Sequence, residues 1–227
     1  MMHENLLWPE GYAPLETAPL PFSAIQSMID SQEIVEGMAV RCDGGKNLHI
    51  TFRGYEGIIP REEVIHPRIS GAEKEIAVLS RVGRSVRAVI TGCTVDGGGR
   101  PLLTLSRRKA QEQALDFLLT ACPPVTVVRG WITHLAPFGA FVDIGCGVIA
   151  LLPLEYISIS RIQHPAQRFS IGQRIRAVIR QTDRAACRFT LTHRELLGTW
   201  LENAALFAPG ETVTDRVRGV KEYGVFV

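Results

Sequence analysis

The chain of 227 residues has no run near the ~20 consecutive apolar residues that a membrane-spanning helix needs. Its N-terminus lacks a basic segment followed by an apolar stretch, so we expect no secretory signal. The five cysteines include no Cys-x-x-Cys pair, and their number is odd. This pattern argues against a disulfide framework or a paired-cysteine site and indicates reduced thiols in a cytoplasmic protein.

Sequence motifs of catalysis are also absent. The chain contains no His-Glu-x-x-His, Gly-x-Ser-x-Gly or Gly-x-Gly-x-x-Gly, and its histidines and cysteines show no metal-ligand spacing. Residues 43–47, Asp-Gly-Gly-Lys-Asn, lack the first glycine and the Ser or Thr of a phosphate-binding loop. We therefore predict a protein that is not an enzyme and that holds no metal and no cofactor.

The charge is unevenly distributed along a chain of ordinary globular composition. The overall net charge is only +2, but residues 1–33 carry net −5 and residues 120–200 carry net +5, with nine arginines and no lysine in the second range. A basic domain joined to an acidic tail indicates a polyanionic partner. A solvated surface that happens to be basic would leave the same trace.

Four sequence blocks occur twice in the same order. Two pairs are offset by 93 residues and a third by 89: Val35–Met38 with Val128–Trp131, Gly57–Pro60 with Ala150–Pro153, and Gly83–Ile90 with Gly172–Ile179. The fourth pairs Leu103–Ser106 with Phe189–Thr192. Ordered blocks separated by small insertions predict two copies of one fold.

A third copy begins near the C-terminus. Phe138–Val142, Phe-Gly-Ala-Phe-Val, returns as Tyr-Gly-Val-Phe-Val over Tyr223–Val227. The repeat stops inside an expected strand, and a lone strand pair is marginal in water. We therefore expect the chain to be a piece of a longer protein.

Each full copy holds about five short β-rich segments in ~70 residues, which favours a five-stranded Greek-key barrel over a seven-stranded sandwich. Apolar periodicity predicts helices over 22–29, 107–119 and 195–207. Four prolines in residues 8–21 predict an extended or disordered stretch there.

The alternation of residues 140–144 predicts a stacking surface. Ala140, Val142 and Ile144 share the parity of the barrel interior, so Phe141 falls on the other face together with Asp143. We take Asp143 as a sign that this face is wet. Gly139 allows a bend that turns Phe138 outward as well. Two exposed rings on a basic barrel would stack nucleic-acid bases; the alternative is that both rings lie in the core.

Residues 131–145, Trp-Ile-Thr-His-Leu-Ala-Pro-Phe-Gly-Ala-Phe-Val-Asp-Ile-Gly, with Ala150–Pro153, Gly172–Ile179, Asp183 and Arg188–Thr192, resemble the S1 RNA-binding domain family. The resemblance implies a mainly β chain of tandem five-stranded OB-fold barrels of S1 type, joined by short helices. The expected divisions are an acidic segment with a short helix (1–33), a degenerate first barrel (34–106), a helical linker (107–124), an RNA-binding second barrel (125–194), a second helical linker (195–209) and a truncated third repeat (210–227).

The resemblance also implies the binding residues. In the second copy it assigns the stacking rings to Phe138 and Phe141, the acid to Asp183 and the arginine to Arg188, with Arg184 as a rival for that arginine. The family's histidine position falls on Pro153. His134 could replace the histidine or be a structural imidazole, and Arg176 is a further candidate contact. Tyr223 and Phe226 hold the ring positions of the third copy.

The first copy departs further from this pattern. A constant offset of 93 residues places Gly45 and Leu48 at the two ring positions and Pro60 at the histidine position. No stacking surface is expected there. Arg41, Lys46 and Arg53 could still touch phosphate. We expect the first barrel to dock to protein or to act as a spacer.

Two functions compete at this point. The first is single-stranded RNA binding without catalysis, in which the protein holds mRNA near the small (30S) ribosomal subunit during translation. The alternative is the accessory RNA-binding region of a ribonuclease or other RNA-processing enzyme whose catalytic domain is absent from this chain. The repeated barrels favour the first. A docking module for protein alone fits only the first copy.

Overall fold

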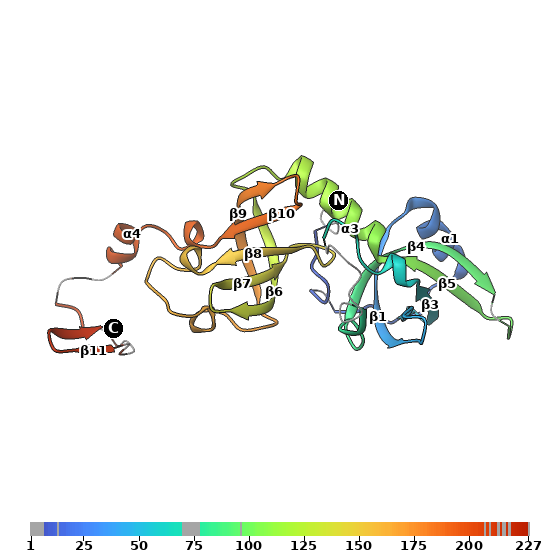
Figure 1. Cartoon of the computed structure of the whole chain (residues 1–227), viewed down its shortest axis with the longest axis horizontal. Helices are drawn as coiled ribbons and strands as arrows, with labels where there is room; N and C mark the ends of the chain where they lie inside the picture. Colours follow the sequence, from blue (N-terminus) through green and yellow to red (C-terminus); the bar gives the residue numbers. More distant parts are fainter. Residues whose placement is uncertain are drawn as a thin grey trace.

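The computed structural model describes residues 7–226 apart from positions 13, 70–77, 96, 207, 209, 213, 215, 216 and 218. Two closed five-stranded barrels follow each other along the chain, and helix α3 (Arg107–Ala121) runs between them (Figure 1). The predicted mainly β class with tandem OB-like barrels is therefore confirmed. No helix in the described part of the chain combines the length and apolar character that crossing a bilayer requires.

Both barrels have the same strand order. The first consists of β1 (Ile34–Cys42), β2 (Leu48–Phe52), β3 (Tyr55–Ile59), β4 (Ser85–Val95) and β5 (Pro101–Ser106), with the 3-10 helix η1 (Arg61–Glu63) after β3. The second consists of β6 (Val127–Ala136), β7 (Gly139–Asp143), β8 (Ile149–Pro153), β9 (Arg174–Asp183) and β10 (Arg188–Thr192), with η2 (Leu154–Tyr156) and η3 (Pro165–Gln167) between β8 and β9. The third strand pairs in parallel with the fifth, and the remaining pairs are antiparallel.

The barrel interiors are filled by the alternating apolar residues of the strands. A glycine in the first strand of each barrel lets a neighbouring strand come close. A Cβ atom at Gly130 would lie 2.4 Å from the Val142 Cγ1 atom, and one at Gly37 would lie 2.6 Å from the Ile50 Cγ2 atom. The two glycines occupy equivalent positions in the repeat, so in both barrels the missing Cβ atom allows the neighbouring strand to pack closely.

Helix α3 joins the barrels. Its N-cap, Ser106, accepts a hydrogen bond from the Lys109 backbone N–H at 3.0 Å. Ala114 and Leu118 on its buried face belong to one apolar cluster that also contains Val89 of the first barrel and Ile132 of the second. Before the first barrel, helix α1 (Phe22–Ser31) buries Ile25 in the other apolar cluster.

Residues 7–12, which we call the N-terminal strap, lie in the junction of the barrels. The prolines of 8–21 predicted an extended or disordered stretch, and the described residues of this range form no helix or strand. The Trp8 carbonyl oxygen accepts from Arg87 Nη1 at 2.8 Å and from the Cys146 N–H at 3.0 Å. The Glu10 N–H donates to the Asp143 carboxylate at 2.9 Å. The strap therefore bonds to both barrels.

After the second barrel the predicted helix over 195–207 is broken. The structure has η4 (Arg194–Leu196) and then α4 (Trp200–Ala204). Between them Gly198 has φ +74°, which ends the first turn, and Thr199 begins α4 through a capping box with Glu202. Further on, β11 (Gly219–Lys221) and β12 (Gly224–Phe226) form a two-stranded sheet.

Candidate nucleic-acid interface

Three rings form a row on the second barrel: His134 on β6, Phe138 in the following turn and Phe141 on β7. The ring centroids of His134 and Phe141 are 5.9 Å apart with a tilt of 37°. Those of Phe138 and Phe141 are 6.0 Å apart and nearly perpendicular, at 86°. His134 and Phe141 are register partners, so their side chains project from the same face. The structure thus brings together three of the residues considered for binding.

The rings of this row are accessible from solvent to different degrees. Phe138 is 61% exposed, His134 is exposed and Phe141 is half-buried. Ala140 and Val142 fill the interior side of β7 instead. Phe138 is therefore not a core residue.

The expectation that Asp143 lies on a solvent-exposed face together with Phe141 is wrong for Asp143 itself. This carboxylate is 2% exposed, although it shares the parity of Phe141. The strap covers it, and it accepts hydrogen bonds from the Glu10, Gly145 and Gly147 N–H groups. Burial, together with the nearby Glu10 charge, raises the pKa of Asp143 to about 7. The outer face of β7 is therefore open at Phe141 and closed at Asp143.

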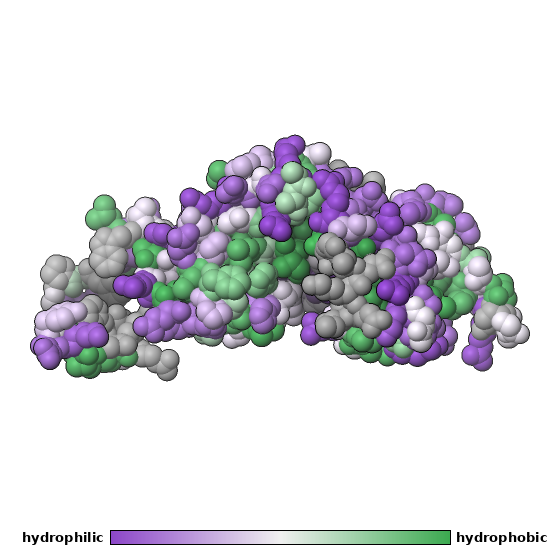
Figure 2. Space-filling model, viewed as in Figure 1, coloured by the Kyte–Doolittle hydropathy of each residue, from purple (hydrophilic) through white to green (hydrophobic). Residues whose placement is uncertain are grey.

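The ring row continues across the barrel as a band of outward side chains, which we call the outer band. Strand register places Phe141 beside Leu151, Leu151 beside Thr190, and Thr190 beside Gln181. Figure 2 shows an apolar area over the second barrel with hydrophilic residues around it. Sequence analysis missed Leu151, Thr190 and Gln181, because only the register of the strands reveals them.

Asp183 and Arg188 lie at one edge of the outer band. They are register partners at the end of the β9–β10 hairpin, each two residues from a band member, and both are exposed. The Asp183 carboxylate accepts from the Ala186 N–H at 3.0 Å, which holds the turn. Arg184 sits in that turn, where its carbonyl oxygen accepts from Arg68 Nη2 of the first barrel at 3.3 Å. Of the two rivals, Arg188 is therefore the one whose strand position lies next to the band.

Arg176 is not brought to the rings. It is exposed on β9 and pairs in register with Arg129 of β6. It lies five residues before Gln181, or roughly 16 Å along the strand at ~3.3 Å per residue. Its carbonyl oxygen lies 2.8 Å from His193 Nδ1. Arg176 would contact only a strand that extends well past the outer band.

Pro153, where the resemblance implies a histidine, ends β8 as the register partner of Gly139. A Cβ atom at Gly139 would lie 2.6 Å from the Leu152 carbonyl oxygen, so the two strands are in close contact. An imidazole reaches the outer band from His134 on β6 instead. Its exposure and its contact with Phe141 fit an interface residue better than a structural one.

The first barrel has the same band with other residues, and the constant offset of 93 misplaced one of them. Register places Arg41 beside His49, His49 beside Ile58, and Ile58 beside Thr104. Seven residues separate the register partners Arg41 and His49, one more than separate His134 and Phe141, so β2 is shifted by one and His49 takes the place of Phe141. Leu48, expected there, is fully buried.

The imidazole of the first barrel is held by a carboxylate. His49 Nε2 lies 3.3 Å from the Asp43 carboxylate. Hydrogen bonds from Asn47 and from His49 lower the pKa of Asp43 to about 2. The first barrel thus offers an imidazole beside an anion in place of a row of rings.

The third-copy candidates can be placed only in part. Tyr223 lies in the β11–β12 turn and is 81% exposed. The side chain of Phe226 lies outside the described residues. The third copy therefore adds no interface geometry to that of the second barrel.

Comparison with known proteins agrees with this fold. A family model described as "S1 RNA binding domain" matches residues 125–194. The small ribosomal subunit protein bS1 of Staphylococcus aureus (strain N315) is 28% identical over 213 residues, which cover 91% of this chain and 51% of that protein. The bS1 protein of Rickettsia conorii is 28% identical over 130 residues, or 55% of this chain and 23% of that one.

A crystal structure of a multidomain protein with nucleic acid binding domains from Streptococcus pneumoniae covers 78% of this chain and 53% of its own, at 12% identity and a TM-score of 0.29. The chain spans about half the length of the first of the curated relatives it matches. Residues 125–194 thus match the S1 RNA-binding domain family, and over most of its length the chain is similar to bacterial small ribosomal subunit protein bS1.

Proposed function

We propose that this protein binds single-stranded RNA through the outer band of its second barrel and acts without catalysis. The observation that carries the proposal is the row of His134, Phe141 and Phe138, with ring centroids about 6 Å apart on an exposed face. Flat rings accept any base, and each stacked base contributes ~1–3 kcal/mol. Asp183 and Arg188 at one edge would contact the sugar and phosphate of the same strand.

The role that fits best is that of ribosomal protein S1. The curated relatives are small-subunit ribosomal proteins that match most of this chain. We propose that the protein holds mRNA near the 30S ribosomal subunit in the cytoplasm, and that the first barrel, whose described residues form no such row of rings, docks to protein or spaces the second barrel. The alternative, a part of an RNA-processing enzyme, draws no support from these relatives.

The test is the affinity of the full chain for an unstructured RNA. Phe141→Ala should weaken binding roughly 5- to 150-fold, the range that ~1–3 kcal/mol of stacking predicts. Phe141→Tyr keeps the ring and should bind like the wild type. Phe22→Ala, at a half-exposed ring on α1 outside the outer band, is the matched control. Equal affinity of Phe141→Ala and the control would refute the stacking surface.

A further inference from the structure

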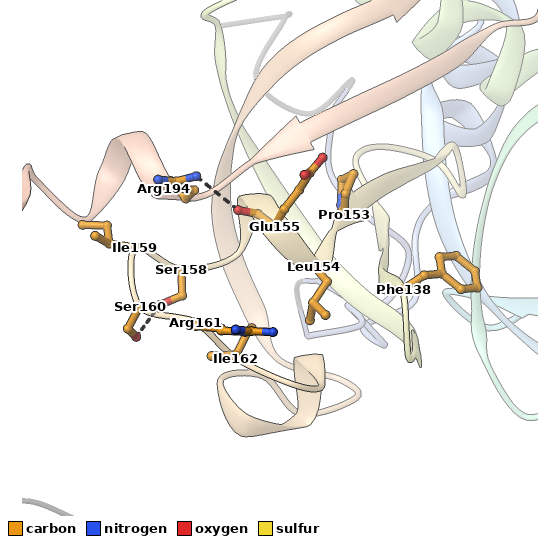
Figure 3. A pocket seen from close by; sticks show the side chains of 10 residues that line it. All are labelled: Phe138, Pro153, Leu154, Glu155, Ser158, Ile159, Ser160, Arg161, Ile162 and Arg194. Atoms are coloured by element: carbon orange, nitrogen blue, oxygen red, sulfur yellow. Dashed lines mark hydrogen bonds between the residues drawn. The ribbon is translucent and has the colours of Figure 1, made fainter. Parts of the chain in front are cut away.

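A hollow of about 500 Å³ opens beside Phe138 (Figure 3). Pro153 at the end of β8, the loop after η2, and Arg194 at the start of η4 line it. Its volume lies in the range of ~300–1,000 Å³ that small-ligand sites occupy. The outer band does not include this hollow, and the resemblance assigns no residue to it apart from Phe138 at its rim and Pro153.

The polar groups of the hollow suit an anion. Arg161 and Arg194 are both exposed and line it, and Arg194 Nη1 donates to the Glu155 carbonyl oxygen at 3.4 Å. The Ser158 and Ser160 hydroxyl oxygens lie 3.1 Å apart. The Glu155 carboxylate also lines the hollow, but Figure 3 shows it directed toward Pro153, with Arg161 on the opposite side of Leu154.

A third guanidinium group, that of Arg168, contacts one of the two serines. Arg168 Nη2 donates to Ser160 Oγ at 2.8 Å. This bond turns the serine oxygen toward a cation and leaves its own hydroxyl hydrogen available to donate to the Ser158 oxygen or to a ligand. The loop therefore presents cationic groups and a hydroxyl donor together, which is the usual chemistry of phosphate recognition.

The hollow has a fixed place relative to the rings. The Leu154 N–H donates to the Phe138 carbonyl oxygen at 2.9 Å, which ties the hollow's wall to the turn that carries the ring. Pro153 pairs with Gly139, so the hollow lies at the Phe138 edge of the outer band. Asp183 and Arg188 lie at the opposite edge. The rings are thus flanked by guanidinium groups on both sides.

We propose that this hollow is an anion subsite in which Arg161 and Arg194 bind a backbone phosphate of the RNA strand, next to the nucleotide that stacks on Phe138. The inference rests on the proposed function and extends it. A guanidinium can hold two phosphate oxygens at once, so the contact fixes the course of the strand as well as adding affinity. An RNA long enough to reach past the rings gains this contact, and a very short one does not.

The experiment uses the full chain and fluorescence anisotropy with labelled oligouridine of about 4 and about 12 nucleotides. One OB fold binds roughly 4–16 nucleotides, so the first length is at the lower limit of that range and the second is well inside it. The test variant is Arg161→Gln with Arg194→Gln. The control is Arg84→Gln with Arg129→Gln, which removes the same charge at two exposed positions outside the hollow. Phe138→Ala is measured in parallel to report on the rings.

We expect the test variant to lose about tenfold in affinity for the 12-mer and the control about twofold. The slope of log affinity against log salt should also become shallower by about 0.7 for each phosphate that the variant no longer neutralises. For the 4-mer, the two double variants should behave alike. Equal losses on the 12-mer would overturn the subsite; if Phe138→Ala still weakens binding, the proposed function survives. A wild-type chain that binds neither RNA would overturn both.

Discussion

Glu10 and Arg107 form a buried, two-point ion pair between segments 97 residues apart. Glu10 Oε1 accepts from Arg107 Nε at 2.6 Å, and Glu10 Oε2 accepts from Nη2 at 3.0 Å. Arg81 of the first barrel donates to the same carboxylate at 3.0 Å, and the Glu10 N–H reaches Asp143 of the second. One strap residue thus links helix α3 and both barrels, which makes this cluster central to how the barrels are held together.

Removing the Glu10 charge should destabilise the whole chain. Glu10→Gln leaves Arg107 buried without its partner, so the free energy of unfolding should fall by about 3–5 kcal/mol. Glu16→Gln is the matched control, because Glu16 pairs with Arg53 at the surface and is 76% exposed there. Its cost should stay below ~1 kcal/mol. Urea denaturation measures both, and equal costs would mean that the buried pair is not what holds the strap.

Asp143 should make the protein less stable as the pH rises from about 4 to about 7. Burial raises its pKa to about 7 in the folded state, while an unfolded aspartate has a pKa of about 3.9. Between these values the folded chain keeps a proton that the unfolded chain has lost. The folded state then binds more protons, so the contribution of Asp143 to the unfolding free energy falls with rising pH.

The measurement compares the wild type with Asp143→Asn, which cannot ionise, by urea denaturation between pH 4.5 and 8. The unfolding free energy of the wild type relative to the variant should decline up to about pH 7 and then level off. Glu10 behaves differently: burial opposes its ionisation, but Arg107 and Arg81 outweigh burial and lower its pKa below the ordinary value of 4.5. Its own contribution is complete above about pH 4.5. Because the Glu10 charge also raises the pKa of Asp143, Glu10→Gln should lose stability less steeply with rising pH than the wild type does. Parallel curves for wild type and Asp143→Asn would contradict the shift.

The fold could be predicted because the signals that specify it are local and repeated. Ala140 and Val142 alternate with Phe141, and the same blocks recur 89–93 residues apart, so the strands, their interior faces and the five-stranded count follow from short patterns. The prediction of one continuous helix over 195–207 was wrong for an equally local reason. Apolar spacing continues through Gly198, but the left-handed φ of that glycine and the cap at Thr199 divide the segment.

The residues of the candidate site could be predicted only where the pattern of a single strand determines the face from which they project. Phe138 and Phe141 follow from the sequence around them. Asp143 does not, because the strap that covers it lies 133 residues away in the chain and no local pattern encodes that contact. His49 was missed because the first barrel has one extra residue between the paired positions of its first two strands, and such a shift of register reverses every side chain of a strand.

Phe138→Ala should separate RNA binding from stability. The ring is 61% exposed, so its removal should change the unfolding free energy by no more than about 0.5 kcal/mol. The same change removes one stacking partner and should lower affinity for unstructured RNA roughly 5-fold or more. Anisotropy and urea denaturation on the same preparation give both numbers. A large loss of stability with unchanged affinity would show that the ring supports the turn and does not bind.

His49→Phe should give the first barrel part of the surface that it lacks. His49 holds the register position of Phe141, beside Ile58 on β3, so a phenylalanine there would project from the outer band of the first barrel. In a Phe141→Ala background, where the second barrel's row is broken, His49→Phe should restore part of the missing RNA affinity, by several-fold if one base stacks on the new ring.

Leu48→Phe is the informative comparison, because the constant offset of 93 residues places Leu48 at the position equivalent to Phe141. Leu48 is fully buried, so the larger ring must be forced into a packed core at a cost of about 1–3 kcal/mol, with no gain in affinity. Opposite results at two adjacent residues would establish the register of β2 from function alone. Recovery of binding by Leu48→Phe and not by His49→Phe would mean that β2 is shifted by one residue from the pairing described above, because only then would residue 48 face outward.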